Sequence, residues 1–342
     1  WGYSFDGATS GPYDDNNEFN TTIGDTSLIT GLGSTSNSAT YGVVISYQTN
    51  FKFKNTTFTN ATTSSIGDLF GFNSSSGPNN TMEVSGNVFT GISHSGSSAA
   101  RVRGVSLAAG TSSTITGNTF TALTTTGYLH AIFCASGTMT ATNNTIGGSP
   151  ANALTSTGSG ALANGITCSS SGSSNHQISA NSISHIIANG GGGTSTAGIT
   201  TNSQGTVIDG NTIQNLSCNG TFDVYGVIVE AGSVTGSIVR NNTISNLSGS
   251  NTGDVIAIEV EGPTTLVSNN NISNVSSSSS GGVWAINTIS ANTTISGNTV
   301  YGLSTSSTGN CSGIVASGGG NNVIIRGNTI KALVVGSSGT NR

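Results

Sequence analysis

The sequence predicts an all-β fold, a parallel β-helix (solenoid) of about ten coils with three short strands in each coil. Three observations lead to this prediction. A segment of the type Thr293–Ser304, TTISGNTVYGLS, recurs along the chain, with its corner asparagine 26 to 37 residues from the next one. Each copy contains short runs in which apolar and polar residues alternate, as they do in half-buried strands. No helical segment lies between these runs.

The corner asparagine marks nine copies of the repeat. Asparagine tolerates the left-handed backbone conformation that a sharp bend between strands requires, so we expect it to turn the chain at each corner. Identical side chains on neighbouring coils can also hydrogen-bond along the axis of a stack. The corner residues are Asn87, Asn118, Asn144, Asn181, Asn211, Asn242, Asn270, Asn298 and Asn328.

Apolar residues accompany each corner three positions before it and two positions after it, and most corners also five positions after it. Around Asn211 these residues are Ile208, Ile213 and Leu216. A third run, Gly226–Val229 in the following segment, closes the coil. Three strands of this kind can bury their apolar faces only by coiling, so that like residues of successive coils stack in one narrow core.

With these repeats the chain resembles the right-handed parallel β-helix proteins of the pectin-lyase-like superfamily. It is most similar to the Asn-, Gly-, Ser- and Thr-rich repeat members found on bacterial surfaces. The resemblance covers about residues 40–342 and concerns the form of the repeat. Enzymes of this superfamily usually degrade acidic polysaccharides, and their hydrolases use Gly-His-Gly and Arg-x-Lys motifs. Neither motif occurs in this sequence.

The chain divides into an amino-terminal segment, residues 1–40, and a parallel β-helix, residues 41–342. The first segment lacks the repeat and is rich in aromatic residues, so we expect either a cap or a docking segment. An end coil exposes its strand edges and its core, and something has to cover them. The chain opens on Trp1 without an initiator methionine or a signal peptide, which suggests a processed mature form or an excised segment.

An apolar run near the carboxyl end has no shielding element after it in the sequence. If the aromatic segment of the next copy covers this run, the contact is head to tail and propagates into filaments. Self-association end to end is therefore the partner interaction that we expect. The residues assigned to this assembly contact are Trp1, Tyr3, Phe5, Leu333, Val334 and Val335.

Composition excludes several classes of function. Only 6% of the residues are charged, with 8 basic and 13 acidic groups and a formal net charge of −5. This balance argues against nucleic acid as a partner, since nucleic-acid binding needs basic stripes. No apolar run of about eighteen residues exists, so we expect no membrane insertion. The overall character favours an extracellular or cell-surface protein.

Two of the four cysteines, Cys134 and Cys168, occupy the same place in the third strands of adjacent coils. Their expected separation, about one strand spacing, lies within reach of a disulfide. The alternative is a pair of stacked thiols that pack as small hydrophobic side chains. The sequence leaves both alternatives open.

A cluster of carboxylates is the candidate site for chemistry. Glu230 and Glu261 end third strands of adjacent coils, and Glu259 lies close by. Carboxylates about 5 Å apart suit a retaining glycosidase. Stacked carboxylates could equally bind a cation or form a solvated acidic patch. Since no basic residue and no aromatic platform is evident beside them, we expect no catalytic residue. The four histidines share no ligand spacing, so we expect neither a metal nor a cofactor.

Attached sugars are a further possibility, because Asn-x-Ser/Thr sequons are numerous. The composition alone accounts for about a dozen of them, so their number carries no weight. The candidate acceptors are Asn55, Asn73, Asn219, Asn292 and Asn310.

The regular coils and sparse chemistry predict an extracellular structural protein without catalytic activity. It would be the subunit of a head-to-tail filament or a segment of a long surface adhesin. The alternative is a polysaccharide-active enzyme, a lyase or a glycoside hydrolase. A third class is a binding module for glycans or ice, although ice binding would need a flat array of outward threonines.

Overall fold

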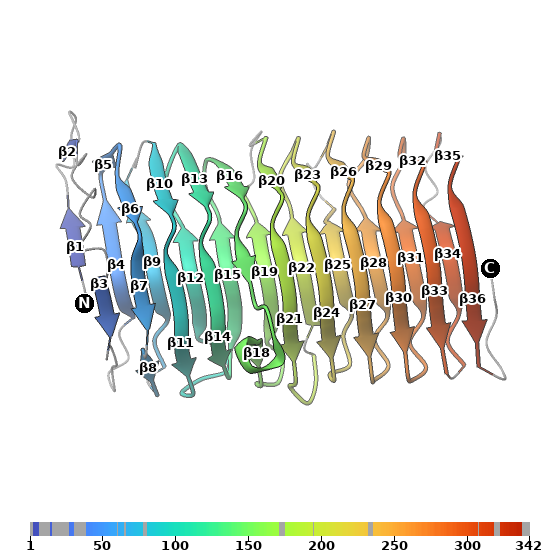
Figure 1. The fold of residues 1–342 in the computed structure, drawn as a ribbon, viewed down its shortest axis with the longest axis horizontal. Coiled ribbons are helices and arrows are strands. Elements are labelled where there is room, and N and C mark those ends of the chain that lie inside the picture. The colour runs from blue at the N-terminus through green and yellow to red at the C-terminus, as the bar shows by residue number, and fades with distance from the viewer. Residues whose placement is uncertain are drawn as a thin grey trace.

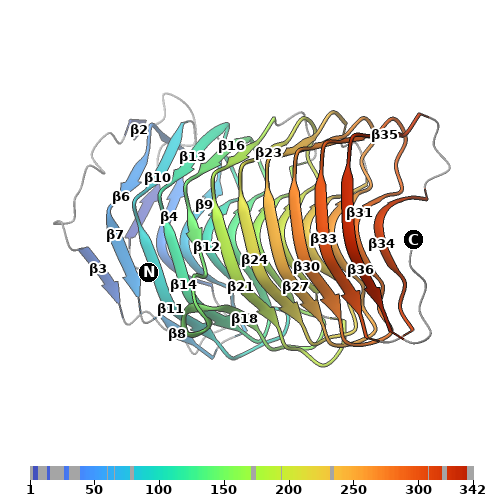
Figure 2. The same ribbon diagram turned by 45° about the vertical axis from the view of Figure 1, so that its right-hand side comes forward.

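The computed structural model describes residues 3–6, 14–15, 27–30, 39–59, 61–64, 66–77, 81–170, 175–193, 195–231, 235–306, 308–317 and 322–336. These residues form three long sheets whose strands all pair in parallel, as the pairs β12–β15, β16–β20 and β24–β27 illustrate. Figure 1 shows the strands following one another along a rod, and Figure 2 shows the coils from the side. The predicted parallel β-helix is confirmed.

Each coil contributes one strand to each sheet, and a few short strands lie beside this path. The eleven-stranded sheet contains β1 (Tyr3–Asp6), β4 (Thr40–Ser46), β9 (Leu69–Ser76), β12 (Arg101–Leu107), β15 (Tyr128–Cys134), β19 (Leu162–Cys168), β22 (Ser195–Thr201), β25 (Val224–Val229), β28 (Val255–Val260), β31 (Val283–Thr288) and β34 (Cys311–Ala316). The ten-stranded sheet contains β6 (Lys52–Lys54), β10 (Met82–Ser85), β13 (Ser112–Thr116), β16 (Thr138–Thr142), β20 (Gln177–Ser179), β23 (Val207–Asp209), β26 (Ile238–Arg240), β29 (Leu266–Ser268), β32 (Thr294–Ser296) and β35 (Ile324–Arg326).

The thirteen-stranded sheet follows each corner. It contains β3 (Ser27–Thr30), β7 (Thr56–Thr59), β8 (Thr62–Thr63), β11 (Val88–His94), β14 (Thr119–Thr125), β17 (Thr145–Ile146), β18 (Leu154–Ser156), β21 (Ser182–Ala188), β24 (Thr212–Cys218), β27 (Thr243–Gly249), β30 (Asn271–Ser277), β33 (Thr299–Thr305) and β36 (Thr329–Val335). A fourth, small sheet pairs β2 (Asp14–Asp15) with β5 (Gln48–Thr49), and one short 3₁₀-helix, η1, spans Pro150–Asn152.

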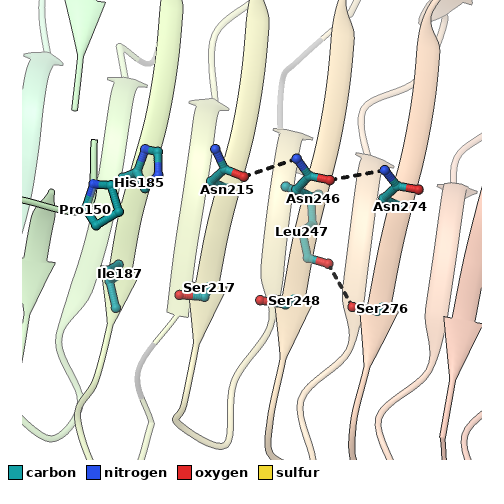
Figure 3. Close-up of a pocket in the computed structure, with 10 residues that line it drawn as sticks. All are labelled: Pro150, His185, Ile187, Asn215, Ser217, Asn246, Leu247, Ser248, Asn274 and Ser276. Atoms are coloured by element: carbon teal, nitrogen blue, oxygen red, sulfur yellow. Dashed lines mark hydrogen bonds between the residues drawn. The ribbon is translucent and has the colours of Figure 1, made fainter. Parts of the chain in front are cut away.

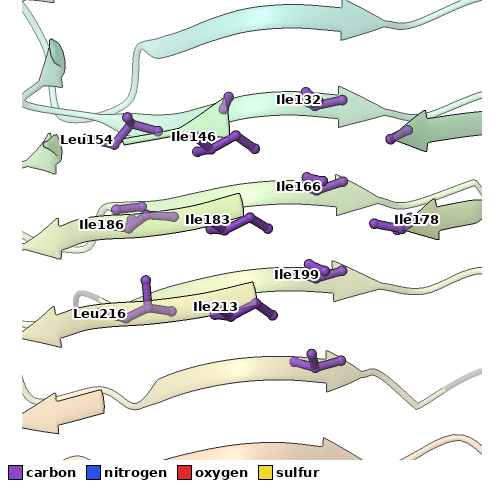
Figure 4. Close-up of a cluster of buried hydrophobic side chains, with 14 of the residues drawn as sticks. Ile132, Ile146, Leu154, Ile166, Ile178, Ile183, Ile186, Ile199, Ile213 and Leu216 are labelled. Atoms are coloured by element: carbon purple, nitrogen blue, oxygen red, sulfur yellow. The ribbon is translucent and has the colours of Figure 1, made fainter. Parts of the chain in front are cut away.

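The core is one column of stacked apolar side chains, as the repeat predicts. Ile208, Val239 and Ile295 are all fully buried, and Ile208 lies directly opposite Val239 in the ten-stranded sheet. Aromatic residues stack in the same way, since the rings of Phe89 and Phe120 lie 4.9 Å apart and nearly parallel. Figure 4 shows isoleucine and leucine side chains from successive coils lying in register.

The corner asparagines form a continuous hydrogen-bonded column, which confirms their predicted stacking. The side-chain nitrogen Nδ2 of Asn211 donates to Oδ1 of Asn242 at 3.0 Å and to the carbonyl of Ile178 at 2.9 Å. The expectation that the corner asparagine itself adopts the left-handed conformation is wrong. That conformation belongs to the preceding residue, such as Gly210 with φ 64° or Asn241 with φ 55°.

A Gly or Ala occupies the same place in each strand of the eleven-stranded sheet from β4 to β34, and the strand bends there. In β25 a Cβ atom added to Gly226 would lie 2.5 Å from the carbonyl oxygen of Ala257 and 2.7 Å from a methyl of Ile244, inside the core. Both Gly226 and the next residue, Val227, therefore face inward, and the outward residues Tyr225 and Ile228 are three positions apart. This bend shapes the outer face on which the candidate site lies.

The described parts of the amino-terminal segment extend the β-helix. In β1, Tyr3 lies opposite Val43, and in β3, Ile29 lies opposite Phe58. Trp1 lies outside the described residues, and only the backbone is described for Tyr3 and Phe5. Whether this segment acts as a cap or as a docking segment stays a prediction.

Candidate functional site

Two rows of outward side chains run along the eleven-stranded sheet, one on each side of the bend. We call them the outer columns. The first column contains Tyr41, Phe70, Arg103, His130, Asn164, Ala197, Tyr225, Ile256, Trp284 and Ser312. The second column contains Val44, Asn73, Ser106, Phe133, Thr167, Thr200, Ile228, Glu259, Asn287 and Val315.

The two outer columns converge, because the bend turns their side chains toward each other. Nη1 of Arg103 donates to the hydroxyl of Ser106 at 3.2 Å. In the next coil the rings of His130 and Phe133 lie 5.2 Å apart. Convergence explains why outward side chains are largely buried, with Arg103 only 8% exposed and Glu259 only 5%. The side chains of the two outer columns therefore cover one another on the outer face of the eleven-stranded sheet. We call this double row of largely buried, chemically varied side chains the seam.

Glu259 is the most perturbed carboxylate of the seam. Nδ2 of Asn287, in the adjacent coil, donates to both of its oxygens at 3.0 and 2.9 Å. The pKa of Glu259 is nevertheless raised to about 7. Burial is the main cause, and the nearby charges of Glu261, Asp223 and Asp254 act in the same direction. The hydrogen bonds from Asn287 lower the pKa and offset part of this rise. Glu259 is therefore a carboxyl group that changes its charge close to neutral pH.

Glu230 and Glu261 lie just beyond the ends of β25 and β28 in adjacent coils, as the sequence indicates. Oε2 of Glu261 accepts a hydrogen bond of 2.9 Å from the backbone of Ala231, the residue after Glu230. Burial and the charge of Glu261 raise the pKa of Glu230. The structure thus brings together the three predicted carboxylates, with Glu259 in the seam and the other two at its edge.

Aromatic side chains stand beside this cluster, which corrects the expectation that no aromatic platform is present. Tyr225 and Trp284 lie in the first outer column on either side of Ile256. The hydroxyl of Tyr225 donates to Oδ2 of Asp223 at 2.6 Å. Aligning the third strands on their central Gly or Ala would have found this column, whereas an alignment on the corner asparagine leaves it unnoticed.

A cavity of about 320 Å³ opens at the carboxyl-terminal end of the seam. Trp284, Ser312 and Val315 line it, and Val315 lies opposite Asn287 in the sheet. Neither Glu259 nor Asn287 is among the residues that line the cavity. Its lining combines an aromatic ring, a hydroxyl group and aliphatic side chains, which is a combination typical of small-molecule sites.

The amino-terminal half of the seam has a different chemistry. The guanidinium of Arg103 stacks on the ring of Phe133 at 3.6 Å and lies 5.8 Å from that of Phe70. Burial lowers the pKa of Arg103 to about 10 and that of His130 to about 3, so this histidine is neutral at physiological pH. Cation–π contacts of this kind hold the arginine in place.

A second depression, of about 490 Å³, lies on the outer face of the thirteen-stranded sheet. Figure 3 shows Asn215, Asn246 and Asn274 in a row along its floor, with Pro150 and His185 at one end. Nδ2 of Asn246 donates to Oδ1 of Asn215 at 3.1 Å, and Asn274 donates to Asn246 at 3.2 Å. This exposed row repeats on the surface the chemistry of the buried corner column.

Cys134 and Cys168 lie opposite each other in β15 and β19, as the repeat predicts. Both are buried, and their thiols are not joined in a disulfide. Burial raises the pKa of Cys134 to about 12, with the Ser136 carbonyl accepting a hydrogen bond from it, so the thiol is not reactive at neutral pH.

The glycosylation candidates differ in accessibility. Asn73 lies within β9 and is only 5% exposed, so its amide is a poor acceptor for a sugar. The other four side chains are exposed and remain predictions: Asn55, Asn219, Asn292 and Asn310.

Within the described residues, no three side chains of the metal-binding types are grouped as an ion would require. No helix in the described part of the chain is long and apolar enough to cross a membrane.

Comparison with known proteins yields three similar solved chains. No family model and no curated protein matches the chain. The chain is similar to the Streptococcus pneumoniae surface protein and adhesin PfbA, with a TM-score of 0.36 and 11% identity over 94% of this chain and 93% of that one. It is also similar to the receptor-binding domain of the siphovirus 9NA tailspike, with a TM-score of 0.23 and 10% identity over 90% of this chain and 72% of that one. TM-scores this low support no statement about function, and the parallel β-helix itself rests on the strand pairing.

Proposed function

We propose that this protein is an extracellular structural rod whose coils stack end to end on a second copy of the chain. In this role it serves as a filament subunit or as a segment of a surface adhesin, and it needs no catalytic activity. The low charge of the chain and its regular coils support the proposal.

The observation that carries the proposal is the exposed core of the last described coil. Ile325 and Ile330 are 49% and 41% exposed, whereas the residues opposite them in the preceding coil, Ile295 and Val300, are fully buried. Leu333 and Val335 are partly buried against the core, and Val334 is 58% exposed. Such apolar surface is stabilised when another coil covers it.

A second copy suits this surface because successive coils of the rod pair in parallel, with equivalent residues lying opposite each other. Ile295 lies opposite Ile325, and the coils present apolar side chains at the same places, with phenylalanine in the first coils and mainly aliphatic residues in the later ones. At the other end, β1 and β3 already pair in parallel with the first full coil. Contact between unlike ends adds copies in one direction and does not close into a ring by itself.

The test is assembly of the purified chain at increasing concentration, followed by light scattering and electron microscopy. We expect rods longer than one chain, and we expect Ile330→Glu to reduce assembly at least tenfold because it places a charge on the apolar surface. Thr299→Glu is the matched control, since Thr299 is exposed on the neighbouring strand. Monomers at every concentration, or unchanged assembly of Ile330→Glu, would refute the proposal.

A second candidate function is a polysaccharide-active enzyme, a glycoside hydrolase or a lyase. What favours it is Glu259, a buried carboxyl group with a pKa of about 7 that lies beside the column holding Tyr225 and Trp284. A carboxyl group with such a pKa can act as a general acid near neutral pH. This candidate predicts release of sugar ends from polysaccharides, with a loss of roughly 10²- to 10⁴-fold in Glu259→Gln.

A further inference from the structure

We propose that the outer face of the eleven-stranded sheet binds the same face of a second copy of the chain, with the two rods side by side and running in opposite directions. The inference goes beyond end-to-end assembly and does not rest on it, because this contact uses the side of the rod. The feature that points to it is a change in the sign of the charge along this face.

The change of sign occurs within one column of residues, at the beginning of the strands of this sheet. Arg101 opens β12, and Asp254 stands five coils later in the same column, directly before β28. The residues between them in the column are Tyr128, Leu162, Ser195 and Asp223. The positive and the negative charge therefore lie roughly 24 Å apart along the rod.

Both charges are available to a partner. The side chain of Arg101 is 52% exposed, and its ion pair with Asp68 is long, at 3.6 Å. Asp254 is half-buried, and its Oδ1 accepts a hydrogen bond of 2.6 Å from the backbone of Gly282. None of the ion pairs within the described residues includes Asp254. Each of these side chains can thus accept a second, opposite charge.

A two-fold axis parallel to the strands, midway between Leu162 and Ser195, joins the opposite charges of two copies. It places Arg101 of each copy opposite Asp254 of the other, so the contact forms twice, as in other symmetric dimers. Leu162 then faces Ser195, and the centre of the interface carries no charge. Rods lying side by side in the same direction would instead bring their acidic halves together, which costs binding energy.

The same axis compensates two charges of the seam. Among the described residues, Arg103 forms no ion pair with a carboxylate and Glu259 forms none with a cation. Ser106, to which Arg103 donates, stands five coils before Glu259 in the second outer column. Arg103 therefore reaches the level of Glu259 of the other copy, and their charges attract across the interface.

The face has about the size that a stable dimer needs. Its strands contain six to eight residues between β9 and β31, so they span roughly 20 Å. The eight strands from β9 to β31 extend roughly 34 Å along the rod. Their product is roughly 700 Å² for each copy, close to the ~800 Å² that each partner buries in a specific complex.

The experiment is a charge swap, followed by analytical ultracentrifugation in the Ile330→Glu background. We expect a reversible dimer in this background that weakens as the salt concentration rises. Arg101→Glu and Asp254→Lys should each weaken the dimer at least tenfold, because each places like charges opposite each other twice. An equimolar mixture of the two variants should dimerise again, since each contact then joins an acidic and a basic side chain.

Arg240→Glu is the matched control. Arg240 is a similarly exposed arginine, at 44%, and pairs with Asp209 on the ten-stranded sheet. Its replacement should leave the dimer unchanged. Circular dichroism shows whether each variant is folded, and Asp254→Asn is the second variant at this position, because it keeps an acceptor for the Gly282 amide while it removes the charge. Asp254→Asn should also weaken the dimer.

Three results would overturn the proposal. They are a monomer at every concentration in the Ile330→Glu background, dimers that Arg101→Glu and Asp254→Asn leave intact, and no recovery in the mixture of folded variants. Long rods of the parent protein together with monomers in the Ile330→Glu background would refute the lateral contact and leave end-to-end assembly standing. Lateral dimers without long rods would have the reverse meaning.

Discussion

Each corner asparagine of the coils uses its side chain in several hydrogen bonds at once. Asn242 donates from Nδ2 to Asn270 and to the carbonyl of Ile208, both at 3.0 Å, and its Oδ1 accepts from the backbone and side chain of Asn211. No other side chain of this size offers two donors and an acceptor in one plane. The column therefore depends on asparagine itself and not merely on a small polar residue.

Asn242→Asp tests this dependence. The aspartate keeps the acceptors but loses both donors, and it places a carboxylate against the carbonyl of Ile208 and Oδ1 of Asn270. We expect a loss of roughly 2 to 5 kcal/mol in the free energy of unfolding. Asn246→Asp is the control in the exposed row and should change stability by less than about 0.5 kcal/mol. Thermal unfolding followed by circular dichroism measures both, and equal shifts would contradict the buried column.

Glu259 makes stability depend on pH in a defined direction. Its pKa in the folded chain, about 7, lies above the ordinary value of 4.5, so the unfolded chain loses this proton first as pH rises. The folded state is therefore destabilised progressively between about pH 4.5 and pH 7, and the cost stays in full above that window. The groups that face Glu259 are Tyr225, Asp223, Asp254, Glu261 and Asn287.

Glu259→Gln should remove this dependence. We expect the variant to gain up to about 3 kcal/mol relative to the parent protein between pH 4 and pH 8. Melting temperatures of both proteins at the two pH values measure the effect, and the difference between them cancels the titration of the other carboxylates. A constant difference at both pH values would show that Glu259 has the same pKa in the folded and the unfolded chain, which would contradict the raised value.

At the scale of the strand, the bend of the eleven-stranded sheet creates the seam. It requires a small residue, because a side chain at Gly226 would point at the Ala257 carbonyl and at Ile244. Gly226→Val should cost roughly 1 to 3 kcal/mol through overpacking and should also separate the two outer columns. Gly191→Ala is the control, since its Cβ would meet nothing within 4 Å. An equal effect of both substitutions on the melting temperature would contradict the bend.

The corner and the core could be predicted from the sequence because both repeat at fixed spacing. Ile208, Val239 and Ile295 are buried where their alignment puts them. The seam could not be predicted from the sequence, because strict alternation places Tyr225 and Ile228 on opposite faces of a flat strand. Only the bend at Gly226 turns both outward, and its signal is a central Gly or Ala in each third strand.

At the scale of the whole molecule, similar contacts recur from coil to coil in the core and at the corners, whereas the residues of the outer columns differ from one coil to the next. The predicted carboxylates Glu230, Glu259 and Glu261 do lie together. The aromatic partner Trp284 was missed, because its neighbours in space are 28 residues away in either direction along the chain. In a repeat of this kind, the core and corner residues stabilise the fold, and the outward side chains are free to differ between coils.

The hydrogen bonds in the column of corner asparagines all run in the same direction along the rod axis. In every step from Asn87 to Asn328, the donor belongs to the earlier coil and the acceptor to the later one. Asn328, in the last described coil, continues this orientation of the amide groups along the rod axis. In the end-to-end assembly that we propose, the partner surface would have to offer an acceptor at this place, whereas two copies joined through the same end would place donor against donor.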